Sequence, residues 1–285
     1  MFPNSDKNSS VLPYLTKATH ISAPFIATFL LIHLTAPALA NVGGSTLSSQ
    51  TMVCEWIDSK KIHHTHTKKN LFHLANLLFY NIIIQSKLLG REYYQSQFGE
   101  KFLVLTPITV HAISAIAKRL LSPKSTTRPP LRRPLSNLLS ITGYASALFF
   151  LPIHYITHRV HPTIENAPIF AVGPSELDYE FVKTGLHVWP WRSWFLYTGL
   201  IVTTSLHLAD GMTIIWNTWL KDIVVFGAWK PSHRNRRLSL AFAGIALPVL
   251  AGLYTLSREP LMAFASTLNR YQTSFISSFI YRIQF

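Results

Sequence analysis

Histidines recur inside the long apolar stretches of this chain, and they are the residues there best suited to chemistry. An ionisable side chain in a bilayer is costly, so such residues are candidates for function. Outside residues 53–85, five histidines lie within these stretches: His20, His33, His111, His154 and His207. Two more, His158 and His161, follow at the end of the third stretch.

The histidines occur in register in two parts of the chain. Aligning His33 with His154 places Leu-Ile-His over Pro-Ile-His. Aligning His111 with His207 places Val-His-Ala over Leu-His-Leu. This pattern indicates a weak internal repeat of two helix pairs, and such repeats commonly place a binding site at their interface.

One histidine on the second helix of each pair is an arrangement that ligates a b-type haem, because haem iron in such sites takes two neutral imidazoles. His111 and His207 are therefore the first candidates for haem ligands, and His33 and His154 the second. Gly211, one turn after His207, would let a macrocycle approach the backbone closely. These short stretches are similar to the membrane-anchor subunits of succinate dehydrogenase and fumarate reductase.

The alternative is a structural role for the same histidines. Interior polar side chains form hydrogen bonds between spanning helices, worth about 0.6–2 kcal/mol each. A transporter is a weaker third hypothesis, because Asp210 is the only other buried charge in the predicted spans. The sequence has no nucleophile elbow, P-loop, paired-carboxylate motif or zinc-hydrolase spacing. We therefore do not expect an enzyme.

The elements that must position these histidines are membrane-spanning helices. Charged residues make up 13% of the chain, against about 25% in a soluble domain. Spanning a bilayer takes roughly 20 apolar residues. Five stretches meet this requirement: residues 19–40, 102–121, 138–156, 194–219 and 238–256. We predict an all-α, polytopic bundle over residues 19–256, with two helix pairs and a fifth helix.

The charges of the loops predict topology and partners. The net charge is +14, and with spanning helices present this excess favours anionic lipid over nucleic acid. Basic and more acidic loops alternate, which fits five spans with the N-terminus on the basic side. Arg128, Arg132 and Arg133, in one acid-free loop, are candidate contacts to lipid headgroups. The alternative is that they only determine topology.

Residues 53–85 differ in composition from the rest of the chain. They combine a cluster of histidines and lysines with an apolar run that ends at Gln85. One interpretation is a loop with a re-entrant or interfacial segment. The other is a translated retained intron, because the residue pairs at 53–54, 75–76 and 84–85 can be encoded by a 5′ splice site, a branch point and a 3′ splice site in that order. In that case the histidines there form no metal site.

The two ends of the chain are predicted to lie outside the bundle. Residues 1–18 form an N-terminal tail that contains no arginine, so an Arg-rich presequence is not expected. Residues 257–285 are apolar but interrupted by Asn269, Arg270, Gln272 and several serines. We interpret them as a C-terminal amphipathic segment in the membrane interface, with a sixth span as the alternative.

Several segments resemble the fungal MDM-complementing (MCP) proteins, a family of multi-pass mitochondrial membrane proteins. The most specific is Arg-Glu-Tyr-Tyr-Gln at residues 91–95. The resemblance covers about residues 19–256 without residues 53–85. Its other segments are Gly-Gly-Ser at 43–45, Pro-Ile-Thr-Val-His at 107–111, residues 144–162, Glu-Phe-Val at 180–182, residues 194–199 and residues 207–211.

The resemblance implies a protein of the mitochondrial outer membrane that acts in lipid homeostasis and mitochondrial organisation. Family members are known for substituting for a lost tether between the endoplasmic reticulum and mitochondria. By analogy the chain would be a contact-site adaptor or receptor for a bridge-like lipid-transfer protein, with membrane lipids as its other partners. The family's best-known receptor has a Pro-x-Pro element in its N-terminal tail, whereas this tail has only the distant Pro3 and Pro13.

Overall fold

The computed structural model describes residues 5–50, 94, 96–122, 135, 137–173, 176–222 and 230–283. Regular structure within these residues is helical throughout. Five helices are long and apolar enough to cross a membrane: Val11–Ser45, Gly99–Leu121, Leu138–Thr163, Pro190–Leu220 and Arg234–Arg258. Each predicted span lies inside one of these helices, so the prediction of an all-α, five-span fold is confirmed. The predicted insertion at residues 53–85 lies outside the described residues.

The first span is formed by α1 (Ser5–Gln50), whereas each of the other four contains at least one π-helical turn besides its α-helical segments. The second span consists of η2 (Gly99–Leu105) and α3 (Thr106–Leu121), and the third of α4 (Leu138–Ala145), η3 (Ser146–Phe150), α5 (Leu151–Tyr155) and η4 (Ile156–Val160). The fourth span consists of α7 (Pro190–Ile215) and η6 (Trp216–Leu220), and the fifth of α8 (Arg234–Ala241), η8 (Phe242–Ala246) and α9 (Leu247–Arg258). The short helices between and after the spans are η5 (His161–Thr163), α6 (Tyr179–Val188), η7 (Pro231–His233), α10 (Ala265–Ser277) and α11 (Phe279–Arg282).

Prolines explain three of the π-helical turns. Pro107, Pro152 and Pro248 each lie two residues after such a turn ends. A proline cannot donate a backbone hydrogen bond, and its ring collides with the carbonyl four residues earlier. In all three spans that carbonyl belongs to the π-helical turn, where the wider ring accommodates the collision. The π-helical turns of these spans are therefore determined locally by the sequence.

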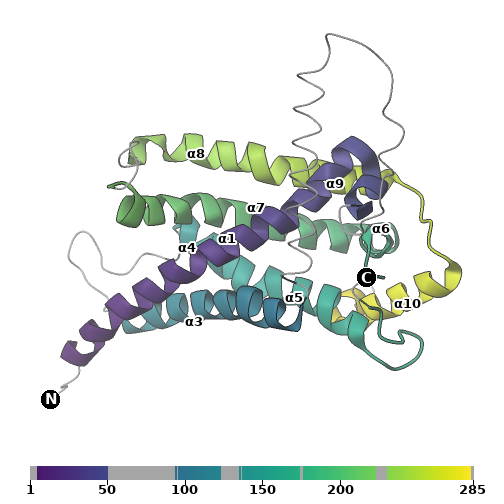
Figure 1. Cartoon of the computed structure of the whole chain (residues 1–285), viewed down its shortest axis with the longest axis horizontal. Helices are drawn as coiled ribbons and strands as arrows, with labels where there is room; N and C mark the ends of the chain where they lie inside the picture. The colour runs from purple at the N-terminus through teal and green to yellow at the C-terminus, as the bar shows by residue number, and fades with distance from the viewer. Residues whose placement is uncertain are drawn as a thin grey trace, which may run out of the picture.

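The spans pack as two pairs and a closing helix. α1 packs against α3, and α4 packs against α7, while the fifth span contacts α1 through α9 and α7 through α8 and η8. In Figure 1, α1 runs obliquely across the other spans. Where α1 meets α9, a Cβ on Gly252 would collide with the carbonyl oxygen of Pro37. Only glycine permits this close approach, as is common between spanning helices.

A layer of short helices covers one end of the bundle, where α6 and α10 lie in Figure 1. α10 has 13 residues, too few to cross a bilayer. Its buried Phe275 stacks on Phe181 of α6 with ring centroids 4.4 Å apart, and Tyr271 contacts the same ring edge-on at 5.3 Å. α10 thus directs these two aromatic residues against α6, and the placement of residues 257–285 in the membrane interface stays a prediction.

Candidate histidine site in the helix bundle

The structure brings His111 and His207 together. His111 lies on α3 and His207 on α7, and their ring centroids are 6.1 Å apart with the ring planes nearly perpendicular. The Nδ1–H of His207 donates to the carbonyl of Leu139 at 3.1 Å. The Nδ1–H of His111 donates to the carbonyl of Thr19 at 3.0 Å. These bonds fix the tautomer of each ring and leave both Nε2 atoms as lone-pair donors.

The structure also brings His33 and His154 together. Their ring centroids are again 6.1 Å apart, with an interplanar angle of 74°. His158 stacks on His154 at 4.3 Å, and its Nδ1–H donates to the His154 carbonyl at 3.1 Å. The Nε2 of His158 then accepts from the hydroxyl of Tyr197 at 2.9 Å. His158 is thus a supporting residue with both nitrogens occupied.

The four paired histidines come from four different spans. α1 and α5 supply His33 and His154, whereas α3 and α7 supply His111 and His207. Residues that are equivalent in the internal repeat therefore face each other. The pair His33–His154 lies beside His158 of the third span, and the pair His111–His207 joins the second and fourth spans. His20 is outside both pairs, since its Nδ1 accepts from the indole N–H of Trp219 at 2.9 Å.

The distance between the ring centroids of each pair is close to that in a bis-imidazole iron site. An imidazole nitrogen lies about 2 Å from a metal ion, so two imidazoles on opposite faces of one iron have ring centres roughly 6–7 Å apart. A hydrogen bond from Nδ1 to a backbone carbonyl is the usual outer support of a ligating histidine. No group of three or more His, Cys, Asp or Glu side chains that could hold a metal ion occurs among the described residues. A ligand set of two histidines suits haem iron better than zinc.

The glycine that accommodates His207 is one that the sequence did not single out. A Cβ on Gly143 of α4 would lie 2.7 Å from Cε1 of His207, so the imidazole packs directly on the backbone there. At Gly211, predicted to permit close approach, a Cβ would meet nothing within 4 Å. Gly143 could have been found only by knowing that α4 and α7 pack together.

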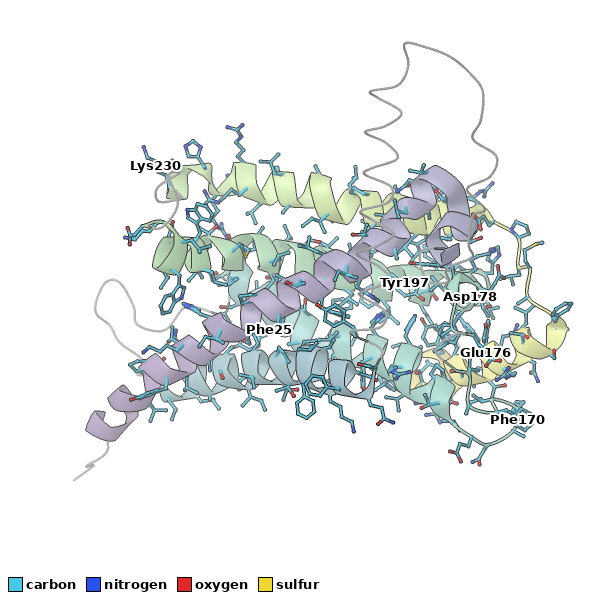
Figure 2. The ribbon with its side chains drawn as sticks, in the orientation of Figure 1. Phe25, Phe170, Glu176, Asp178, Tyr197 and Lys230 are labelled. Atoms are coloured by element: carbon cyan, nitrogen blue, oxygen red, sulfur yellow. The ribbon has the colours of Figure 1, made fainter. Side chains whose placement is uncertain are left out.

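One end of the bundle is rich in basic side chains, whereas several described acids of the covered end are paired with Arg159, Lys183 and Arg270. Figure 2 shows Lys230 at one end and Glu176 and Asp178 at the other. At the basic end, Arg234 holds Asp210 through two bonds, Nε to Oδ1 at 2.9 Å and Nη2 to Oδ2 at 2.6 Å. The candidate headgroup residues Arg128, Arg132 and Arg133 lie outside the described residues, so their role stays a prediction.

A buried lysine organises the opposite end. Lys183 of α6 is 1% exposed and pairs with Glu180 at 2.5 Å and Glu259 at 3.4 Å. Glu259 also accepts from the backbone N–H of Ser45 at 2.8 Å. Burial raises the pKa of Glu259, but the bonds from Ser45 and the charge of Lys183 outweigh it and hold this pKa below its ordinary value. In the sequence, only the spacing of Glu180 and Lys183 by one helical turn could have predicted part of this ion-pair cluster.

Comparison with known families identifies part of the chain. Residues 149–259 match the family described as MDM10-complementing protein 1, transmembrane domain. The match includes His154, His207 and the Asp210–Arg234 pair, whereas His33 and His111 precede it. No curated protein and no solved structure is significantly similar to the chain. Residues 149–259 therefore belong to the MCP1 transmembrane-domain family, a family of mitochondrial membrane proteins.

Proposed function

We propose that the protein acts in lipid homeostasis and mitochondrial organisation from the mitochondrial outer membrane, as a contact-site adaptor for a lipid-transfer protein. The family match over residues 149–259 is the observation that carries this proposal. The basic end around Lys230, Arg236 and Arg237 is a second support, because it suits an anionic lipid surface.

Recruitment tests the adaptor role. We expect that overproducing the chain in fungal cells moves a fluorescently tagged bridge-like lipid-transfer protein onto mitochondria. An unrelated multi-pass outer-membrane protein, produced to the same level, serves as the control and should leave the distribution unchanged. An unchanged distribution with the chain itself correctly inserted would argue against the adaptor role.

The paired histidines favour a second candidate function, a b-type-haem protein. Two pairs with ring centroids 6.1 Å apart, contributed by four spans, are the observation that supports it. His111 and His207 would hold the iron through Nε2, while Thr19 and Leu139 orient the rings through their carbonyls. A bound haem supplies one-electron redox chemistry.

An absorption spectrum of the purified protein tests this second candidate. We expect a reduced-minus-oxidised difference spectrum with Soret and α-bands, and loss of one haem equivalent in His207→Ala. His20→Ala is the matched control, because His20 lies in a span but outside both pairs. Protein that stays colourless after reconstitution with excess haem would refute the candidate and leave the histidines with a structural role.

A further inference from the structure

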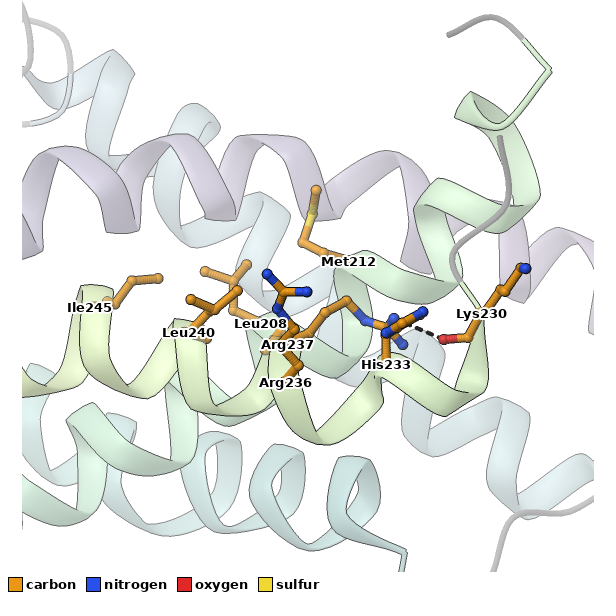
Figure 3. Close-up of a pocket in the computed structure, with 10 residues that line it drawn as sticks. Leu208, Met212, Lys230, His233, Arg236, Arg237, Leu240 and Ile245 are labelled. Carbon is orange, nitrogen blue, oxygen red and sulfur yellow. Dashed lines mark hydrogen bonds between the residues drawn. The ribbon is translucent and has the colours of Figure 1, made fainter. Parts of the chain in front are cut away.

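A groove lies between α7 and the start of the fifth span, at the basic end of the bundle. Its volume is about 720 Å³, within the roughly 300–1,000 Å³ range of ligand clefts. Figure 3 shows its lining residues, which come from α7, α8 and the residues around them. They are Leu208, Ala209, Met212, Lys230, His233, Arg236, Arg237, Leu240, Ala241 and Ile245.

The groove is amphipathic along its length. Lys230, His233 and the two arginines gather at one end, and Leu240 and Ile245 lie at the other, as Figure 3 shows. Ile245 follows Arg237 by eight residues, which corresponds to about 12 Å along a helix. That distance carries the lining from the start of the fifth span into its apolar part.

The described lining of the groove carries positive charge. No acidic residue is among the described residues that line it. The nearby acid, Asp210, is held by Arg234 through two short bonds, and neither residue lines the groove. Asp210 therefore links α7 to α8 through Arg234, and no described lining residue offers an anion to Lys230 and Arg236.

One arginine of the groove is held in place. Arg237 donates from Nε to the hydroxyl of Thr213 at 3.2 Å and from Nη1 to the carbonyl of Lys230 at 2.9 Å. These bonds link α7, α8 and the residue before η7 around the cationic end. A guanidinium fixed in this way loses little further freedom when it binds a phosphate.

We propose that this groove binds one anionic glycerophospholipid of the surrounding bilayer. The phosphate lies against Lys230, Arg236 and Arg237, and an acyl chain lies along Leu240 and Ile245. Charge complementarity selects the anionic headgroup, since arginine recognises phosphate oxygens with paired N–H groups. The apolar end favours a lipid over a free phosphate, because a phosphate ion without an acyl chain gains nothing from contact with Leu240 and Ile245. The site does not depend on the adaptor role or on haem.

Lipid titration of the full-length protein in neutral detergent tests the cationic end. We expect phosphatidylglycerol to bind roughly tenfold or more tightly than phosphatidylcholine, because each basic residue near an anionic headgroup adds to its attraction. The double variant Lys230→Gln, Arg236→Gln should lose this preference. Lys221→Gln is the matched control, because Lys221 lies at the same end but does not line the groove. Equal affinity for the two lipids in the unchanged protein would overturn the proposal.

A second variant tests the apolar end and separates lipid from free anion. Ala241→Phe should fill the groove and weaken phosphatidylglycerol binding, whereas Ala251→Phe on the exposed side of α9 should not. Glycerol phosphate in large excess should not displace the lipid. Full displacement by glycerol phosphate, or equal effects of the two phenylalanines, would contradict a lipid site. Helix content and thermal midpoint of each variant establish that it is folded.

Discussion

At the scale of single residues, the two ends of the bundle use ionisable groups in different ways. At the covered end, Lys183 is removed from water and compensated by two carboxylates. At the basic end, Asp210 is compensated by one arginine, and Lys230 and Arg236 line the groove. The first group is closed and structural, whereas the second leaves charge available for a ligand.

Replacing Lys183 should destabilise the covered end of the protein. Lys183→Met leaves Glu180 and Glu259 facing each other without their cation, and breaking a buried pair in this way costs about 3–5 kcal/mol. We expect a clearly lower thermal midpoint in detergent. Arg258→Met, a change to an exposed neighbour of Glu259, is the control. Equal midpoints for the two variants would show that the pair contributes little.

Gly44 is a second residue with a specific requirement. Its φ is +62°, and a Cβ there would collide with the carboxylate of Glu259. Gly44→Ala should therefore displace Glu259 from Ser45 and Lys183 and lower the thermal midpoint. Alanine at Gly211, where a Cβ meets nothing within 4 Å, should leave the midpoint nearly unchanged. A similar loss at both glycines would contradict this explanation.

At the scale of elements, the position of α10 depends on its contacts with α6 and with the loop that precedes α6. Phe275→Ala should release α10, because truncating a fully buried phenylalanine costs about 3–5 kcal/mol. Limited proteolysis within residues 258–278 measures this release. Phe279→Ala, at a position 59% exposed, is the matched control. Unchanged proteolysis of Phe275→Ala would mean that α10 is held by other contacts.

Acid should also loosen α10. Arg270 of α10 pairs with Glu176 at 3.1 Å and holds the pKa of that carboxyl below its ordinary value. The contribution of this pair is complete above the ordinary pKa of about 4.3 and is lost as the pH falls through the lowered value. Proteolysis of α10 should therefore increase below about pH 4, and Glu176→Gln should show the faster cleavage already at neutral pH.

The spans could be predicted from the sequence, because the tendency of a segment to cross a membrane depends on its own residues. Twenty apolar residues cannot remain in water, so the five spans were visible as hydropathy alone, and loop charge indicated their alternation. The register of the repeat aligned His33 with His154 and His111 with His207, and the structure brings the rings of each aligned pair together. The contact of Gly143 with His207, and the bond of Arg234 to Asp210, could not be predicted, because each depends on how separate helices pack.

At the scale of the whole molecule, we predict that the five candidate spans place the basic end and the covered end on opposite sides of a membrane. Single cysteines at Ser232 and Glu165, each in a Cys54→Ser background, test this arrangement. A membrane-impermeant reagent applied to intact mitochondria should label only one of the two positions, and permeabilisation should expose the other. Labelling of both without permeabilisation would contradict a membrane crossing by Pro190–Leu220, the span between the two positions.

The central claim is that this membrane protein serves mitochondrial lipid homeostasis, and rescue of tether-deficient fungal cells tests it most directly. The chain would be produced in cells that lack a tether between the endoplasmic reticulum and mitochondria, and mitochondrial phospholipid composition would be measured alongside growth. The proposed function predicts that composition and growth return toward those of intact cells. Cells that keep their lipid and growth defects, despite normal amounts of the protein in the outer membrane, would contradict it.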